Sequence, residues 1–377
     1  MHKTHERALD ALARRGRHRV LTTASGADFT SNDYLGLAAS RELRNAARAA
    51  LEREVPIGSG GSRLLRGNHR EHEALEAEAA AFFGGESALF LGSGFVANVA
   101  LFSTLPQRGD LIVHDALIHA SVHDGMRASK AERAEARHNE PQAVEDAITD
   151  WRAAGGKGTP WIAVESLYSM DGDRAPLADL SAIADRHDGI LVIDEAHATG
   201  VFGREGRGLG ADLEGRANVV TVHTCGKALG VMGALVLGPK VLRDYLVNRC
   251  RPFIYATAPS PLVAAMVRAA LLICRFDSPR REQLHNLMDV GARLIEERCG
   301  VTASGSQIQP VIVGSDERAV RLAAAMQARG FDVRAVRPPT VPEGSARLRI
   351  TWTLNVDAAC VEAMIATLAE ELERLAP

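Results

Sequence analysis

Two short stretches carry side chains whose types and spacing suit Schiff-base chemistry. In the first, TVHTCGKALG, Lys227 stands between Gly226 and Gly230, directly after an apolar segment that is typical of a buried strand. An amine that attacks a carbonyl must be neutral, and a free lysine, with a pKa of about 10.4, is almost fully charged at neutral pH. Burial beside a cationic ring lowers that pKa and makes the amine reactive. Taken alone, the stretch also fits a surface lysine that follows a strand.

The second stretch is ILVIDEAHATG, in which an apolar strand ends in Asp194 and His197 follows three residues later. A carboxylate at the end of an apolar strand is costly unless it has a cationic partner, and a protonated pyridine nitrogen is one such partner. A strand-capping Asp with a structural His explains either residue alone. The pattern Asp-x-x-His, followed one strand later by Thr224-x-x-Lys227, favours a shared site, because parallel strands bring their ligand groups to one sheet edge.

Two weaker signals precede these stretches. The turn GSGF, which contains Gly94 and Phe95, joins a strand to a helix, and free amides at a helix N-terminus bind phosphate. A plain strand-to-helix turn is the alternative. His119 follows the apolar strand LIVHD, where a structural role and stacking on a flat ring are both open. His119 and His123 have the spacing of a metal pair, but no third ligand accompanies them, so we predict no metal site.

The elements that must position these groups alternate between short apolar strands and helical patterns from residue 87 to residue 237. This alternation predicts a mostly parallel sheet with helices on both faces. The C-terminal part contains the segments QPVIVG, FDVRAV and ARLRITW between helical patterns, which predict a second α/β domain with an antiparallel sheet. We therefore expect an N-terminal arm (1–45), a large domain (46–285) and a small domain (286–377).

Composition narrows the class of protein. The chain has 377 residues and a net charge of −3, which argues against a nucleic-acid partner. Its five cysteines are scattered without a CxxC pair, as in proteins of reducing compartments. No apolar run approaches the roughly 20 residues that span a bilayer, and the charged N-terminus is not a secretory signal. We expect a cytoplasmic protein without membrane segments.

Nine motifs occur in the order found in one enzyme family: SNDYLGL, GSGGSRLLRGN, GSGFVAN, IHAS, SMDGDRAPL, DEAHATG, HTCGKALG, RPPTVP and ARLRIT. Through them the chain resembles, over nearly its whole length, the α-oxoamine synthases among the fold-type I pyridoxal-phosphate enzymes. The resemblance implies an aspartate-aminotransferase-like large domain, a smaller C-terminal domain and a homodimer. Cys225 departs from the family pattern, where other small or apolar residues stand.

The resemblance also implies roles for individual residues. Lys227 would form the imine with pyridoxal 5′-phosphate, Asp194 would keep the pyridine nitrogen protonated, and His119 would stack on the ring; these three are the expected catalytic residues. Further cofactor contacts would come from Gly94, Phe95, Ser169, His197, Thr224 and, toward the neighbouring subunit, Thr257. Substrate contacts would come from Asn32, His119, Thr340 and Arg349.

The implied reaction is the decarboxylative condensation of an amino acid with an acyl thioester. The motifs favour L-alanine with pimeloyl-CoA, or with a pimeloyl carrier protein, as in biotin biosynthesis. A sister reaction of glycine with acetyl- or succinyl-CoA stays open. A catalytically silent scaffold subunit is the alternative from another class, and the presence of Lys227 with Asp194 argues against it.

Overall fold

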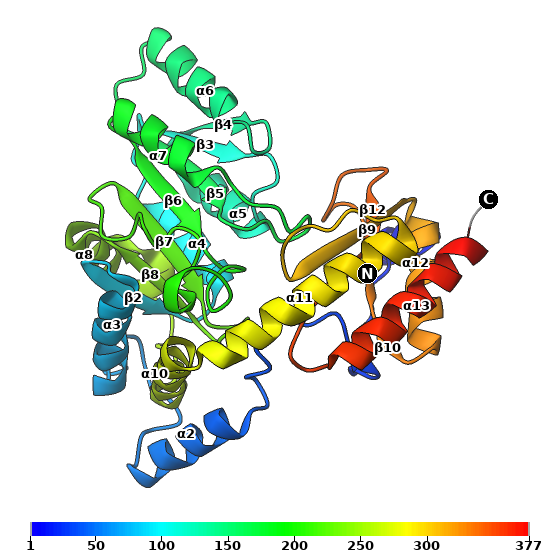
Figure 1. Cartoon of the computed structure of the whole chain (residues 1–377). Coiled ribbons are helices and arrows are strands. Elements are labelled where there is room, and N and C mark those ends of the chain that lie inside the picture. The colour runs from blue at the N-terminus through cyan, green and yellow to red at the C-terminus, as the bar shows by residue number, and fades with distance from the viewer. Residues whose placement is uncertain (1, 376–377) are drawn as a thin grey trace. The chain divides into compact units, whose positions relative to one another are not determined.

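The computed structural model of the protein describes residues 2–375. These residues divide into two compact units. The larger unit comprises Leu35–Ser169 and Arg174–Arg281, and the smaller one comprises the chain up to Tyr34, the segment Met170–Asp173 and the chain from Glu282 onward. Figure 1 shows the elements of both units, and each unit is described by itself. The expected boundaries at residues 45 and 285 stay a prediction.

The larger unit contains, within the described residues, a seven-stranded sheet of order β2-β8-β7-β6-β5-β3-β4. Only β8 runs antiparallel to its neighbours, so the mostly parallel sheet that the sequence predicts is confirmed. Parallel strands buried on both faces need continuous apolar runs, which the inner strands β3, β5 and β6 have, whereas the edge strand β4 has the charged and mostly exposed sequence ERAEA. The strands are β2 (Ser87–Leu91), β3 (Leu111–Asp115), β4 (Glu132–Ala136), β5 (Pro160–Glu165), β6 (Ile190–Asp194), β7 (Val219–Thr224) and β8 (Ala234–Gly238).

Helices cover both faces of this sheet, as predicted (Figure 1). Alternate residues of the strands face opposite sides. Ile112 and Val192 pack with α4, α5 and α8, whereas Val113 and Ile193 pack with α6 and α7. The helices of this unit are α2 (Arg41–Glu52), α3 (Arg70–Phe83), α4 (Gly94–Thr104), α5 (Ala120–Ala128), α6 (Pro141–Ala153), α7 (Leu177–Arg186), α8 (Lys240–Arg249), α9 (Arg251–Ile254) and α10 (Pro261–Phe276), with the 3-10 turn η1 (Arg204–Gly206).

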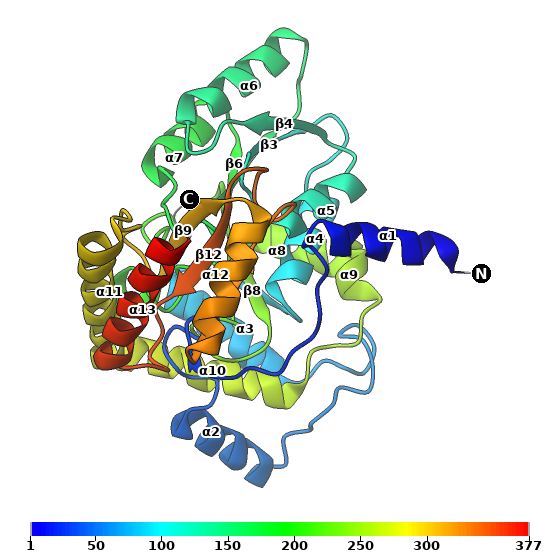
Figure 2. The ribbon, with the colours of Figure 1, turned by 90° about the vertical axis from the view of Figure 1, so that its right-hand side faces the viewer.

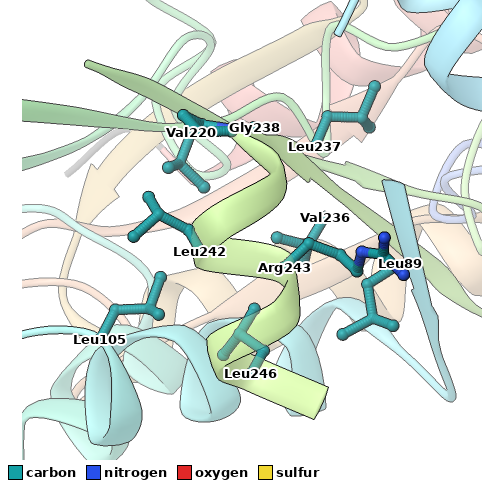
Figure 3. Close-up of a pocket in the computed structure, with 10 residues that line it drawn as sticks. Leu89, Leu105, Val220, Val236, Leu237, Gly238, Leu242, Arg243 and Leu246 are labelled. Carbon is teal, nitrogen blue, oxygen red and sulfur yellow. The ribbon is translucent and has the colours of Figure 1, made fainter. Parts of the chain in front are cut away.

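One small apolar cavity lies between α8 and the sheet (Figure 3). Its volume is about 10 Å³, and Leu89, Val236, Leu242 and Leu246 are among the side chains that line it. A water molecule needs at least about this much space together with polar partners. The cavity is therefore a gap in core packing and not a place for a cofactor.

The smaller unit has the antiparallel sheet that the C-terminal sequence predicts, in the order β11-β12-β9. Figure 2 shows α12 and α13 beside this sheet, and Trp352, which follows β12, is fully buried. Gly291 on α11 lies against that indole, because a Cβ there would come within 2.8 Å of the ring. The elements are α1 (Lys3–Arg14), β1 (Ala27–Asp28), α11 (Ser278–Cys299), β9 (Ile308–Gly314), α12 (Asp316–Ala328), β10 (Phe331–Asp332), β11 (Arg334–Val336), β12 (Ala346–Thr351) and α13 (Ala358–Arg374).

None of the helices in the part of the chain that the structure describes is long and apolar enough to cross a membrane.

Candidate active site

Three neighbouring parallel strands of the larger unit end at one edge of the sheet. Strand β5 ends in Glu165 and β6 ends in Asp194, and these two residues are register partners. Asp194 is in turn the register partner of Val222 on β7, which leads into Thr224 and Lys227. The carboxyl ends of parallel strands are the usual place for ligands in open α/β sheets. The topology thus brings the expected lysine and aspartate to the same sheet edge.

Asp194 is buried and each of its carboxylate oxygens has a donor. The backbone amide of Ala196 donates to Oδ1 at 2.9 Å, and the side-chain amide of Asn98 donates to Oδ2 at 2.7 Å. Only 7 % of Asp194 is exposed. Two donors hold the carboxylate in one orientation at the strand end, as an electrostatic partner for a cation requires.

A chain of hydrogen bonds connects Asp194 with His119. Asn98 on α4 also donates to Ser121 Oγ at 3.0 Å, and Ser121 Oγ lies 2.7 Å from His119 Nδ1. The Ser121 amide donates to the same Nδ1 at 3.2 Å, so His119 caps α5 through this nitrogen. An accepting Nδ1 leaves the proton of the neutral imidazole on Nε2. Asn98 and Ser121 are both fully buried, and neither was among the site residues expected from the sequence.

The imidazole of His119 favours its neutral form. Solvent reaches the residue, yet desolvation by the surrounding protein lowers its pKa, and the positive charge of Lys227 lowers it further. The negative charge of Asp194 opposes this shift. A neutral flat ring beside a lysine and an aspartate suits stacking on an aromatic cofactor, the role that the resemblance implies.

Lys227 contacts His197 directly. Its Nζ lies 2.7 Å from His197 Nε2; the lysine is half-buried and the histidine is buried. A hydrogen bond between two nitrogens needs one donor and one acceptor, so the two groups cannot both be cationic. The loop that presents Lys227 closes at Gly230, which has φ +66°, and a Cβ there would come within 2.6 Å of the Ala38 amide nitrogen. Only glycine fits this turn without strain.

The turn before α4 adjoins the end of β7. Ser93 caps α4 by accepting from the Val96 amide at 3.2 Å. A Cβ on Gly94 would lie 3.3 Å from Thr224 Oγ1, so the helix N-terminus and this hydroxyl are neighbours. A helix N-terminus beside a hydroxyl is a common way to bind phosphate. Together with the acceptor Asp194 and the amine of Lys227, these groups fit pyridoxal phosphate.

The remaining expected cofactor residues are placed as follows. Ser169 is buried, and Phe95 is 47 % exposed. Thr257 is exposed on the loop between α9 and α10. Their roles toward the cofactor stay predictions.

Asp115, at the end of β3, fixes the loop that carries His119. The amides of Leu117 and Asn139 donate to its two carboxylate oxygens, each at 2.8 Å, and His138 Nδ1 lies 2.8 Å from Oδ1. Burial works against ionisation here, but the hydrogen bonds from His138 and the two amides hold the pKa of Asp115 below its ordinary value. The carboxylate is therefore charged and orders the approach to α5.

Glu165 is a second buried carboxyl group at this sheet edge, and it was not among the site residues expected from the sequence. Its Oε2 accepts from the Ser169 amide at 3.1 Å, and only 2 % of the residue is exposed. Desolvation, together with the charge of Asp194, raises the pKa of Glu165 to about 8, although Lys227 opposes the shift. The strand WIAVE ends in this carboxylate just as ILVID ends in Asp194, so the same pattern was available in the sequence.

Two of the expected substrate residues meet within the smaller unit. Arg349 on β12 is buried, and its Nη2 donates to Asn32 Oδ1 at 3.1 Å. The hydroxyl of Tyr34 donates to the same oxygen at 3.0 Å. Thr340 is exposed and accepts instead from Arg19 at 3.3 Å. A buried guanidinium held by a side-chain amide suits recognition of a carboxylate.

Comparisons with known proteins agree with this chemistry. The aminotransferase class I and II family model matches residues 25–370. The 8-amino-7-oxononanoate synthase of Chromobacterium violaceum is 43% identical over 348 residues, which cover 92% of this chain and 89% of that protein. The solved structure of 8-amino-7-oxononanoate synthase from Francisella tularensis has a TM-score of 0.78 at 27% identity and covers 93% of this chain and 98% of that one.

A serine palmitoyltransferase from S. paucimobilis shares the fold, with a TM-score of 0.89 at 24% identity over 99% of this chain and 98% of that one. The family model and the 43% identity extend over most of the chain. The chain therefore belongs to the aminotransferase class I and II family and, within it, to the 8-amino-7-oxononanoate synthases.

Proposed function

We propose that this protein condenses L-alanine with a pimeloyl thioester to form 8-amino-7-oxononanoate, the free thiol and carbon dioxide, with pyridoxal phosphate as its cofactor. The observation that carries the proposal is the meeting of Lys227, His197 and Asp194 at one sheet edge, next to a helix N-terminus. The curated relatives support the choice of reaction, because the similar proteins carry the name of this synthase over nearly their full length. The product places the reaction in biotin biosynthesis.

Pyridoxal phosphate supplies an aldehyde that takes up the amino acid and a ring that withdraws electrons from its α-carbon. Asp194 would face the ring nitrogen and hold a proton there, because its carboxylate is fixed by Asn98 and Ala196. His119 would cover one face of the ring and exclude water from it. The α4 N-terminus and Thr224 would hold the phosphate.

Lys227 would move the proton of the substrate α-carbon. General-base catalysis of this kind contributes about 10²- to 10⁴-fold, provided that the amine is neutral when it acts. His197 Nε2 lies 2.7 Å from Nζ and so orients the amine. The same amine can return the proton to the α-carbon after carbon dioxide has left.

Arg349 would bind the carboxylate of L-alanine. Its guanidinium is buried and keeps a fixed direction through Asn32, whose carbonyl also accepts from Tyr34. A planar guanidinium recognises a carboxylate through two parallel hydrogen bonds, which lysine cannot reproduce.

We infer further that the working enzyme is a cytoplasmic homodimer, with Thr257 directed at the phosphate bound by the partner chain. The exposure of Thr257 in the single chain supports this role.

A panel of substrates tests the proposed reaction. Purified enzyme is given L-alanine or glycine, each with pimeloyl-, acetyl- and succinyl-thioesters, and the release of thiol and carbon dioxide is followed. The proposal expects the alanine–pimeloyl pair to turn over fastest, whether the thiol is CoA or a carrier protein. Faster turnover of glycine with acetyl- or succinyl-CoA would assign the sister reaction instead. The Lys227→Ala variant serves as the blank.

A further inference from the structure

Two carboxyl groups lie side by side at the proposed cofactor site. Glu165 ends β5, Asp194 ends β6, and the two are register partners in a parallel ladder. Register partners of adjacent strands project from the same face of a sheet. Both are buried, with 2 % of Glu165 and 7 % of Asp194 exposed. We refer to them as the Glu165–Asp194 pair.

The hydrogen bonds of the pair are unequal. Both oxygens of Asp194 receive donors, from Ala196 and Asn98. In Glu165 only Oε2 receives one, from the Ser169 amide, and Oε1 is buried with no hydrogen-bond partner in the described part of the chain. A buried anionic oxygen without a donor is costly, whereas a protonated carboxyl group carries no such charge. The donors are thus arranged for a charge on Asp194 and none on Glu165.

The two carboxylates nearest to Glu165 also favour its neutral form. Asp194 on β6 and Asp115 on β3 disfavour a further negative charge, while Lys227 after β7 favours one. Desolvation of the fully enclosed carboxyl group adds the largest penalty to the ionised form and, with Asp194, raises the pKa of Glu165 to about 8. At neutral pH the neutral form therefore predominates in the folded chain.

We propose that Glu165 is a positioning residue that stays protonated in the working enzyme, so that Asp194 alone carries a negative charge at these two strand ends. The proposal rests on the proposed function in one respect, namely that the charge of Asp194 serves the cofactor ring nitrogen. A neutral Glu165 gives Asp194 a neighbour that fills the space without competing for that cation. At alkaline pH Glu165 loses its proton, and the pair then carries two charges.

Glu165→Gln is the direct test, because glutamine is neutral, nearly isosteric, and keeps an oxygen for the Ser169 amide. Glu135→Gln, an exposed glutamate on β4, is the matched control. The unfolding of the full-length chain without added cofactor is measured from about pH 5 to about pH 9.5 for wild type and both variants. This measurement does not depend on which reaction the enzyme catalyses.

The expected sign follows from proton binding. Folded Glu165 binds its proton more tightly than the unfolded residue, with a pKa of about 8 against an ordinary value of 4.5. Its contribution to stability is complete below the unfolded value and is lost as the pH rises through the folded one. Wild type should therefore lose stability relative to Glu165→Gln between about pH 5 and about pH 8, with no further loss above that. A Glu165→Gln curve parallel to those of wild type and Glu135→Gln would overturn the proposal.

The Asp194→Asn variant tests whether the two carboxyl groups are coupled. If Glu165 only filled space, this substitution would not move the pH at which the stability curve breaks. Without the charge of Asp194, the proton of Glu165 is lost at lower pH, so the break in the stability curve should move toward acid. A break that stays in place would show that the two carboxyl groups are not coupled and would contradict the proposal.

The affinity for pyridoxal phosphate, measured at two pH values, tests whether the charge of Glu165 affects cofactor binding. At about pH 6.5 the affinities of wild type and Glu165→Gln should agree within about twofold, and they should diverge at about pH 9, where wild type carries the additional charge. A tenfold or larger difference already at about pH 6.5 would mean that Glu165 is charged there and would refute the proposal. If neither chain binds the cofactor, the proposed function fails, while the cofactor-free comparison still decides the protonation of Glu165.

Discussion

Removal of the Asn98 side chain should weaken both the fold and the proposed cofactor site. Asn98 Nδ2 donates to the charged carboxylate of Asp194 at 2.7 Å and to Ser121 Oγ at 3.0 Å. A hydrogen bond to a charged group contributes about 1.5–3 kcal/mol and one between neutral groups about 0.5–1.5 kcal/mol. Both partners are buried, so water does not readily replace the lost donor. We expect Asn98→Ala to lower the free energy of unfolding by about 2–4 kcal/mol.

Urea denaturation of the cofactor-free chain measures this change. Asn218→Ala is the matched control, because Asn218 also donates to a carboxylate, Asp185, at 2.8 Å, but at the surface. The control should cost less than about 1 kcal/mol. Asn98→Leu, which keeps most of the side-chain volume, separates the loss of the hydrogen bonds from the loss of packing.

Asn98→Ala should also loosen the position of the His119 side chain. The hydrogen bonds that connect Asp194 with this imidazole pass through Asn98 and Ser121. Pyridoxal phosphate should bind more weakly to Asn98→Ala than to the control variant at equal folded fraction. A free energy of unfolding of Asn98→Ala within about 0.5 kcal/mol of that of Asn218→Ala would show that the buried donor contributes no more than the exposed one.

Three further predictions concern other parts of the site. Lys227→Ala should bind pyridoxal phosphate without a covalent link, so that dialysis removes the yellow colour of the cofactor. Its turnover should fall by about 10²-fold or more. Colour retained by the variant on dialysis would contradict this prediction. Asp115→Asn should lower the free energy of unfolding by about 2–4 kcal/mol near neutral pH, because it removes a charged acceptor of two amides and His138. The pKa of Asp115 is lowered by folding, so its contribution is present above the ordinary value of 3.8 and is lost as the pH falls. Urea titrations at several pH values check this sign: Asp115→Asn should lose less stability toward acid than wild type does, and an equal or steeper loss in the variant would contradict it. Arg349→Ala should lower kcat/KM for L-alanine by about 10²-fold or more, and Arg349→Lys should restore little of the lost kcat/KM. Steady-state kinetics with varied L-alanine measures both variants. Full rescue by lysine would argue against bidentate binding of the carboxylate.

The sequence predicts the architecture well, because strands of a parallel sheet that are buried on both faces must be apolar throughout. LIVHD, WIAVES and ILVID satisfy this requirement, and all three form neighbouring strands of the sheet. The antiparallel sheet of the smaller unit was also evident, from short strand patterns separated by helices. The antiparallel direction of β8 beside β7 could not be predicted, because the direction of a strand depends on how the chain returns to the sheet and not on the residue pattern of the strand.

The positions of the expected site residues were predictable where a reactive side chain stands at or just after the end of a strand. Lys227, Asp194 and His197 all follow apolar strands, and the structure places the lysine against this histidine. Asn98 and Ser121 were missed because each lies within a helix, where a single polar residue gives no sign of its distant partner. The hydrogen bonds of Asn98 join it to residues 23 and 96 positions away in the chain, and only the packing of α4 against α5 and the sheet brings these residues together.

We expect the amine of Lys227 to bond covalently to the aldehyde of pyridoxal phosphate. Reduction of the cofactor-loaded enzyme with borohydride, followed by digestion and mass spectrometry, tests it most directly. We predict that the reduced pyridoxyl group is found on the peptide that contains Lys227 and that L-alanine added before the reduction diminishes this labelling. Labelling of a different lysine, or no stable labelling at all, would show that Lys227 does not form this bond.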